Sequence, residues 1–138
     1  MDKNQKIIFE VGQRASLTKK FGEAEVLNFS KMSMDDNPIH FDADYAENSR
    51  FGKRIVQGPF VASLIGGILG SQLPGPGTIY INQTSNFLAP VFIGETIIAN
   101  VEITSIRQDK PIIKLRTWVE KENGELAIDG EAVTLYLK

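Results

Sequence analysis

Residues 55–94 decide the fold of this chain: they read IVQGPFVASLIGGILGSQLPGPGTIYINQTSNFLAPVFIG and contain no charged side chain. In residues 59–73, large apolar side chains lie around most of a helical circumference: Phe60, Val61, Leu64, Ile65, Ile68 and Leu69. A helix that is apolar on nearly every side is usually enclosed by the rest of the protein. The segment is too short to span a bilayer, which takes roughly 20 apolar residues. The sequence therefore predicts a buried central helix.

Both ends of this predicted helix carry residues that mark a boundary. Pro59 stands in the first turn, where its missing N–H would have had no intrahelical partner. Gly58 then lies at the N-terminus, where free N–H groups and the helix dipole suit a developing negative charge such as an enolate oxygen. An ordinary helix start is the alternative reading of Gly58. Residues 74–77, PGPG, stop the helix and turn the chain.

Strand-like segments make up much of the remaining chain: residues 7–11, 15–21, 78–88, 96–107, 111–121 and 125–137. The later ones alternate apolar and polar side chains, and Asn123-Gly124 is a strong hairpin signal. Gly130 marks a bulge or a close backbone approach. Residues 23–33 form a modest amphipathic helix. About five strands and one long helix predict the α+β class, with a curved antiparallel sheet wrapped around the central helix.

Composition narrows the classes of protein that this chain can be. With 138 residues and 42% hydrophobic content, one globular domain over residues 1–138 has enough material for a core. A net charge of −2 without a Lys/Arg run argues against nucleic acid or a membrane surface as the main partner. The absence of cysteine excludes disulfides and thiolate metal sites. Residues 1–13 lack the apolar segment of a secretory signal, which predicts a cytoplasmic protein.

The candidate chemistry lies in residues 33–40, SMDDNPIH. Pro38 disfavours helix in the residue before it, so the chain turns there. The turn can bring Asp35 and His40, the only histidine, towards one point, where they could form an acid/base pair. Each residue also has an ordinary alternative. These are a surface histidine, a turn aspartate, and an Asn37 side chain bonded to its own backbone.

SMDDNPIH, followed by FDADYA, resembles the hydratase motif of the MaoC-like family, the (R)-specific enoyl-CoA hydratases with a hot-dog fold. The resemblance covers nearly the whole chain. It includes EVGQRASLTKKFGEAEV, RIVQGPFVASLIGGILGSQLPGPGTIY, APVFIGETI and DGEAVTLYL, which look like parts of the short hydratases that feed polyhydroxyalkanoate synthesis. It implies a single hot-dog domain over residues 1–138.

The resemblance also implies roles for individual residues. Asp35 and His40 would be catalytic, and the Gly58 N–H would receive the thioester carbonyl oxygen. The other substrate-binding positions would be Asn37 and the acyl-pocket residues Gly66, Leu69 and Thr134. The chain departs from the family pattern at Met34, where many members have glycine or a small polar residue, and at Gln57-Gly58-Pro59, which replaces the more usual His-Gly-Met. Gly66 falls where some relatives carry serine, which predicts a roomier and less polar pocket.

The function that the resemblance implies is reversible hydration of trans-2-enoyl-CoA to (R)-3-hydroxyacyl-CoA. The coenzyme A thioester would be the substrate, and no metal or other cofactor is expected. A homodimer whose sheets join edge to edge is expected, with the substrate tunnel near its interface. Arg50, Lys53 and Arg54 either meet coenzyme A phosphates or are solvated loop charges. Two alternatives remain open: an acyl-CoA thioesterase with the same fold, and a non-catalytic acyl-CoA-binding protein.

Overall fold

The computed structural model describes residues 9–137. The elements in chain order are β1 (Arg14–Lys20), α1 (Glu23–Ser33), the 3-10 helix η1 (Pro38–His40), α2 (Ala43–Glu47), α3 (Gly58–Ser71), β2 (Thr78–Phe87), β3 (Thr96–Ile106), β4 (Ile112–Lys121) and β5 (Leu126–Tyr136). The predicted helices and the strands from β1 onward are confirmed to within two residues. The strand predicted over residues 7–11 is not confirmed: 9–11 are not in a strand, and 7 and 8 lie outside the described residues. The short helix α2 was not predicted.

The strands form one antiparallel sheet in the order β1-β3-β4-β5-β2. Strands β3, β4 and β5 pair in chain order as an antiparallel meander, while β2 follows α3 and pairs with β5 at the edge. Gly130 confirms the predicted close backbone approach, because a Cβ there would lie 1.9 Å from the Thr84 carbonyl oxygen. The sheet therefore has two edges, β1 and β2.

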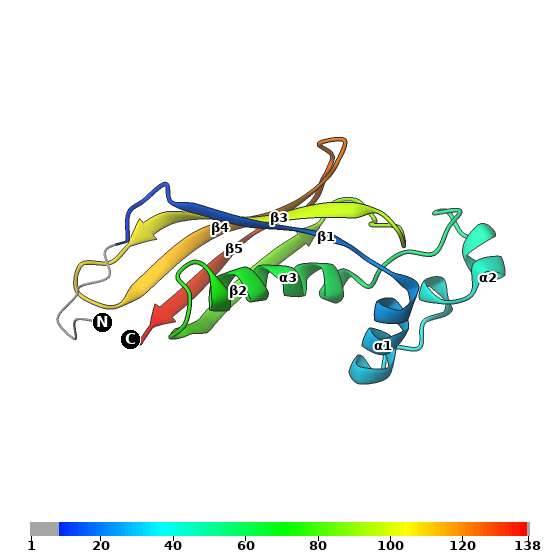
Figure 1. Cartoon of the computed structure of the whole chain (residues 1–138), viewed down its shortest axis with the longest axis horizontal. Helices are drawn as coiled ribbons and strands as arrows, with labels where there is room; N and C mark the ends of the chain where they lie inside the picture. The colour runs from blue at the N-terminus through cyan, green and yellow to red at the C-terminus, as the bar shows by residue number, and fades with distance from the viewer. Residues whose placement is uncertain (1–8, 138) are drawn as a thin grey trace.

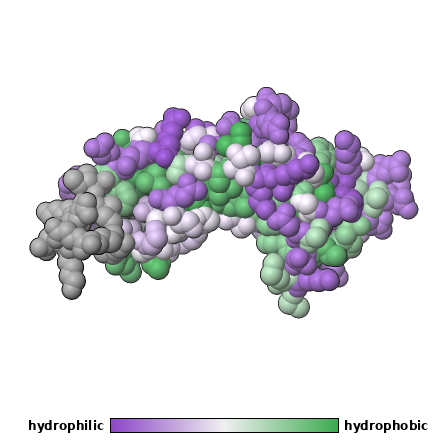
Figure 2. Space-filling view, viewed as in Figure 1, coloured by the Kyte–Doolittle hydropathy of each residue, from purple (hydrophilic) through white to green (hydrophobic). Residues whose placement is uncertain are grey.

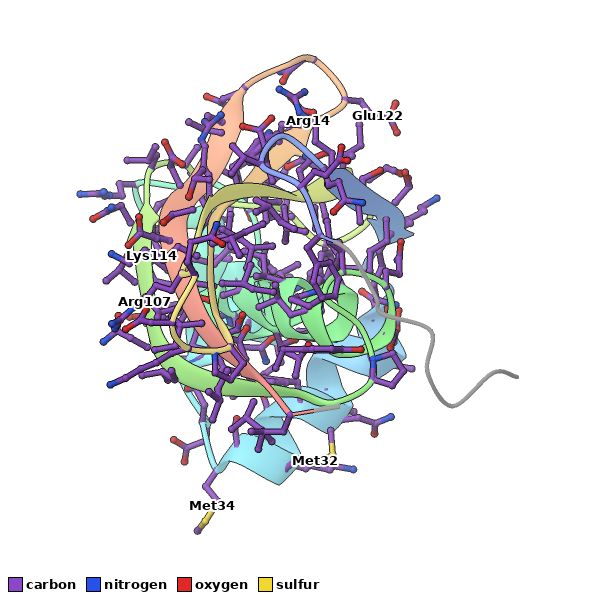
Figure 3. All side chains as sticks on the ribbon, turned by 90° about the vertical axis from the view of Figure 1, so that its left-hand side faces the viewer. Arg14, Met32, Met34, Arg107, Lys114 and Glu122 are labelled. Carbon is purple, nitrogen blue, oxygen red and sulfur yellow. The ribbon has the colours of Figure 1, made fainter. Side chains whose placement is uncertain are left out.

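Helix α3 lies in the concavity of the sheet, which curves around it when viewed end-on (Figure 3). The face of α3 toward the sheet is fully buried and carries Val61, Ile65, Ile68 and Leu69. Burial of each such side chain contributes roughly 1.5–3 kcal/mol. The opposite face is not enclosed by this chain, and its exposed residues are Pro59, Ser63, Gly67, Gly70 and Ser71. The prediction of burial on nearly every side is thus wrong for this face, because a single sheet covers only one side of a helix.

Helices α1 and α2 project beyond one end of the sheet (Figure 1). Phe29 of α1 stacks on Phe60 of α3, with ring centroids 4.7 Å apart, and this contact joins the projecting part to the core. Apolar surface is visible on the projecting end (Figure 2). Met32 and Met34 contribute to it, since both point away from the sheet and are 77% and 88% exposed (Figure 3). Within residues 9–137, no helix is long and apolar enough to cross a membrane.

Candidate active site

Asp35 is positioned by the end of α1. Met34 ends the helix in the left-handed conformation, with φ of 64°, and the Asp35 N–H donates to the Ser30 carbonyl over 3.1 Å. A left-handed φ is the conformation that glycine adopts most readily, so the glycine that the family pattern leads us to expect would suit this position. Met34 takes the same conformation with its side chain in solvent. The departure at Met34 therefore leaves the turn to Asp35 intact.

The turn between Asp35 and His40 is held by two short-range hydrogen bonds. The Asn37 N–H donates to Asp35 Oδ1 over 3.0 Å, and Asn37 Oδ1 accepts from the Ile39 N–H over 3.3 Å. Pro38 begins η1 directly after this cap. The Asn37 side-chain oxygen is therefore engaged by its own backbone turn, as one of the alternatives predicted. Substrate binding by Asn37 stays a prediction.

His40 meets Asp35 as the motif predicts. The imidazole is 6% exposed, and its Nε2 lies 3.5 Å from Asp35 Oδ2. Its Nδ1 lies 2.8 Å from the Ile55 carbonyl oxygen. Because a carbonyl oxygen can only accept, Nδ1 carries the proton in the neutral ring. The lone pair of Nε2 is then available on the side where the Asp35 carboxylate lies.

Gly58 is the first residue of α3, directly after the N-cap residue Gln57. The first N–H groups of a helix have no intrahelical acceptor, and Pro59 has no N–H, so the Gly58 N–H is a free donor at the positive end of the dipole. A Cβ at position 58 would lie 2.9 Å from Cε1 of Phe87. Glycine is therefore needed here for the aromatic ring to cover the helix start.

Asp35 and Gly58 open into two different hollows of the single chain. The hollow at Gly58 measures about 260 Å³ and is lined mainly by apolar side chains, with Arg50 as its one cation. The hollow at Asp35 measures about 390 Å³ and opens to the surface. His40 connects them, since its Nε2 faces Asp35 and its Nδ1 is bonded to Ile55, which lines the Gly58 hollow.

The other two predicted cations have partners within the chain. Arg54 forms an ion pair with Glu23 of α1, and the Lys53 ammonium lies 5.7 Å from the centre of the Phe92 ring. Arg50 lies over the Phe51 ring at 5.0 Å. All three cations thus have a neighbour within the chain, but of the three only Arg50 lines the Gly58 hollow, from whose mouth it could reach a phosphate.

Two of the three predicted acyl-pocket residues, Gly66 and Thr134, lie beside Tyr80. Gly66 faces the Tyr80 hydroxyl, which would be 3.3 Å from a Cβ at that position. Thr134 is paired with Tyr80 across β2 and β5, and its buried hydroxyl donates to the Ile113 carbonyl over 2.9 Å. Leu69 is buried one turn further along α3. Tyr80 thus fills part of the space beside Gly66 and supplies a polar group there. Its partial burial raises the pKa of the Tyr80 phenol, so the hydroxyl stays protonated at neutral pH.

Three contributors to the site could not be recognised as such from the sequence. The Ile55 carbonyl is a backbone group and leaves no signal in the residue type. Phe87 is one of eight phenylalanines, and nothing in its neighbours marks it as the cover of Gly58. Gln57 stood out only as a departure from the family pattern. Within residues 9–137, no three His, Asp or Glu side chains form a group that could hold a metal ion.

Comparison with known proteins identifies the family. The family model described as "MaoC like domain" matches residues 4–124. The chain belongs to this family. It is 49% identical to an (R)-specific enoyl-CoA hydratase from Aeromonas caviae, over 90% of this chain and 92% of that protein. An (R)-specific enoyl-CoA hydratase from Rhodospirillum rubrum is 42% identical, over 90% of this chain and 85% of its own length.

Solved structures agree with this family membership. An (R)-hydratase from A. caviae involved in PHA biosynthesis superposes with a TM-score of 0.91 at 48% identity, covering 93% of this chain and 97% of that one. The predicted α+β hot-dog fold of this MaoC-like protein is therefore confirmed, with a five-stranded antiparallel sheet around α3.

Proposed function

We propose that this MaoC-like protein is an (R)-specific enoyl-CoA hydratase, which adds water reversibly to trans-2-enoyl-CoA to give (R)-3-hydroxyacyl-CoA. The observation that carries the proposal is the environment of His40. A buried imidazole with Nδ1 bonded to the Ile55 carbonyl presents the lone pair of Nε2 beside the Asp35 carboxylate. That arrangement occurs in a chain 49% identical to an (R)-specific enoyl-CoA hydratase.

The Asp35–His40 pair would activate the water. Nε2 of His40 and Oδ2 of Asp35 are both hydrogen-bond acceptors, so one water molecule beside them can donate a proton to each. Loss of one proton to the pair lets the water oxygen bond to the β carbon of the enoyl group. The pair then returns a proton to the α carbon, and the reaction is complete without a metal or a redox group.

Gly58 would stabilise the charge that develops between these two steps. As the water oxygen adds, the π electrons of the double bond shift toward the thioester carbonyl, whose oxygen becomes an enolate oxygen. The N–H at the start of α3 suits that charge better than it suits the neutral carbonyl, which is the condition for faster chemistry. The apolar hollow at Gly58 would take an apolar part of the substrate beside the thioester.

The working protein would be a cytoplasmic homodimer of one domain per chain, residues 1–138. Strand β2 supports the dimer, because it forms a sheet edge and exposes the large apolar side chains Ile79 at 51%, Ile81 at 52% and Phe87 at 56%, and Leu88 directly after it is 58% exposed. Such an edge tends to pair with another strand. Charge substitution by Ile79→Lys together with Ile81→Lys should therefore give monomers in analytical ultracentrifugation. A dimer that survives both substitutions would place the interface elsewhere.

The proposed function is tested with crotonyl-CoA in three parallel assays. The first follows loss of the conjugated ultraviolet absorbance, the second uses a thiol reagent, and the third couples the product to an (R)-specific 3-hydroxyacyl-CoA dehydrogenase. Hydratase activity predicts loss of absorbance and coupled signal without free thiol. Thiol release would indicate a thioesterase instead. Binding of acyl-CoA without conversion, also with longer chains and acyl carrier protein thioesters, would indicate a binding protein.

A further inference from the structure

Gln57 is a buried polar side chain directly beside the candidate active site. It is 1% exposed, and its Nε2 donates to the Val26 carbonyl over 2.9 Å and to Ser30 Oγ over 2.7 Å. Its Oε1 is buried and has no hydrogen-bond partner among the described residues. A buried carbonyl oxygen without a partner is unfavourable. An apolar side chain of similar size would avoid that cost but could not donate the two hydrogen bonds to α1. These two hydrogen bonds therefore point to the role of Gln57.

The direction of the Gln57 amide is fixed by its surroundings. The Val26 carbonyl can only accept, so the amide must present its NH₂ group and not its oxygen to α1. The same NH₂ group spans to Ser30 on the next turn of α1. One side chain from the start of α3 therefore holds two successive turns of α1.

These contacts join the two halves of the site. The Ser30 carbonyl accepts the Asp35 N–H, so the residue that Gln57 holds is also the one that fixes the turn to Asp35. Gln57 is also the N-cap of α3, and the peptide group that joins it to Gly58 contains the Gly58 N–H. Two residues before it, the Ile55 carbonyl holds His40. Residues 55–58 thus contact His40, carry the Gly58 N–H and hold Ser30, whose carbonyl fixes the turn to Asp35.

We infer that Gln57 is a positioning residue for the hydration, setting the separation between the Asp35–His40 pair and the Gly58 N–H. This inference rests on the proposed function. The reaction needs water at the β carbon and a hydrogen bond at the carbonyl oxygen of the same thioester, so the two halves must keep one fixed separation. A displacement of about 1 Å in such a geometry can cost on the order of 10²-fold in rate.

The test compares Gln57→Leu with Gln57→His. Leucine removes both donated hydrogen bonds, whereas histidine keeps one ring N–H that can reach α1. We expect kcat for crotonyl-CoA to fall about 10- to 100-fold in Gln57→Leu with KM within about twofold of the parent, and Gln57→His to recover most of kcat. Thr117→Val is the matched control. Thr117 is also buried and polar but lies on β4, so this variant should lower Tm without changing kcat per folded molecule.

Ser30→Ala removes the acceptor at the other end and guards against a Gln57→Leu variant that fails to fold. It should lower kcat in the same direction, by a smaller factor, since the bond to Val26 is kept. The inference is overturned if folded Gln57→Leu or Ser30→Ala keeps the parental kcat. It is also overturned if the control Thr117→Val loses as much kcat per folded molecule as these two variants do. A parent that hydrates no enoyl thioester would instead refute the proposed function. The two failures are therefore distinguishable.

Discussion

The start of α3 and its middle, at Gly66, are built in different ways. At its N-terminal end, Gly58 and the Asp35–His40 turn depend on backbone groups and directed hydrogen bonds. At Gly66, one face of the same helix depends on side-chain packing against Tyr80 and the sheet. Directed bonds fix positions that chemistry needs, whereas packing fixes the shape of a space. Changes at the start of α3 should therefore lower kcat, and changes near Gly66 should alter which acyl chains are accepted.

The helix itself sets the distance between these two positions. Gly58 and Gly66 are eight residues apart, which corresponds to about 12 Å along an α-helix. A short acyl chain held at Gly58 would end before Gly66, whereas a long one would reach it. Effects at Gly66 should therefore depend on acyl length, while effects at the start of α3 should not.

The largest effect is expected from Asp35 and His40, the proposed acid/base pair. Asp35→Asn and His40→Ala should each lower kcat by roughly 10²- to 10⁴-fold, because each removes a positioned acid/base group. The loss should be the same for crotonyl-CoA and for a long-chain enoyl-CoA. Initial rates from the ultraviolet assay, with circular dichroism to show that each variant is folded, measure it. Parental rates in either folded variant would remove that residue from the mechanism.

Periodicity and local motifs predicted most of the fold and the proximity of Asp35 and His40. Alternation placed β3, β4 and β5, and the Asp-x-Asn-Pro-x-His spacing brought Asp35 and His40 together, since both act through local geometry. The Gln57 contact to Ser30 and the Tyr80 contact to Gly66 could not be predicted in the same way. They join segments far apart in the chain and depend on how α3 packs. The exposed face of α3 was not predicted. A hydrophobicity pattern does not say which neighbouring element covers each side of a helix, so uncharged small residues on an open face could not be told from buried ones.

A smaller loss is expected from Gly58→Ala. The added Cβ would lie 2.9 Å from the Phe87 ring, so the ring or the start of α3 must move. Because the N–H itself is kept, we expect kcat to fall by about 10- to 100-fold. This is less than the largest losses of kcat, about 10³-fold, that follow removal of an oxyanion-hole donor. The double variant Gly58→Ala/Phe87→Leu should recover part of the loss. No recovery in steady-state kinetics would mean that the helix start, and not the ring, is displaced.

The effect of a substitution at Gly66 on kcat/KM should depend on the length of the acyl chain. Gly66→Ser places a side chain 3.3 Å from the Tyr80 hydroxyl and narrows the space that a long acyl chain would enter. We expect kcat/KM to fall about tenfold for a long-chain enoyl-CoA and to stay within twofold for crotonyl-CoA. Gly66→Ser/Tyr80→Phe keeps the serine and removes the hydroxyl that it meets. An equal loss of kcat/KM with both substrates would contradict the distinction between the start of α3 and the region around Gly66.

The smallest effect on turnover is expected at Thr134. Its buried hydroxyl donates to the Ile113 carbonyl, so Thr134→Val keeps the shape of the side chain and removes one hydrogen bond. The free energy of unfolding should fall by about 1 kcal/mol, measured by urea denaturation. The kcat for crotonyl-CoA should be unchanged, because a residue that fixes the shape of the space takes no part in moving protons. A loss of kcat as large as that of His40→Ala would instead place Thr134 with the proposed acid/base groups, and directed hydrogen bonds would then set the chemistry near Gly66 as well as at the start of α3.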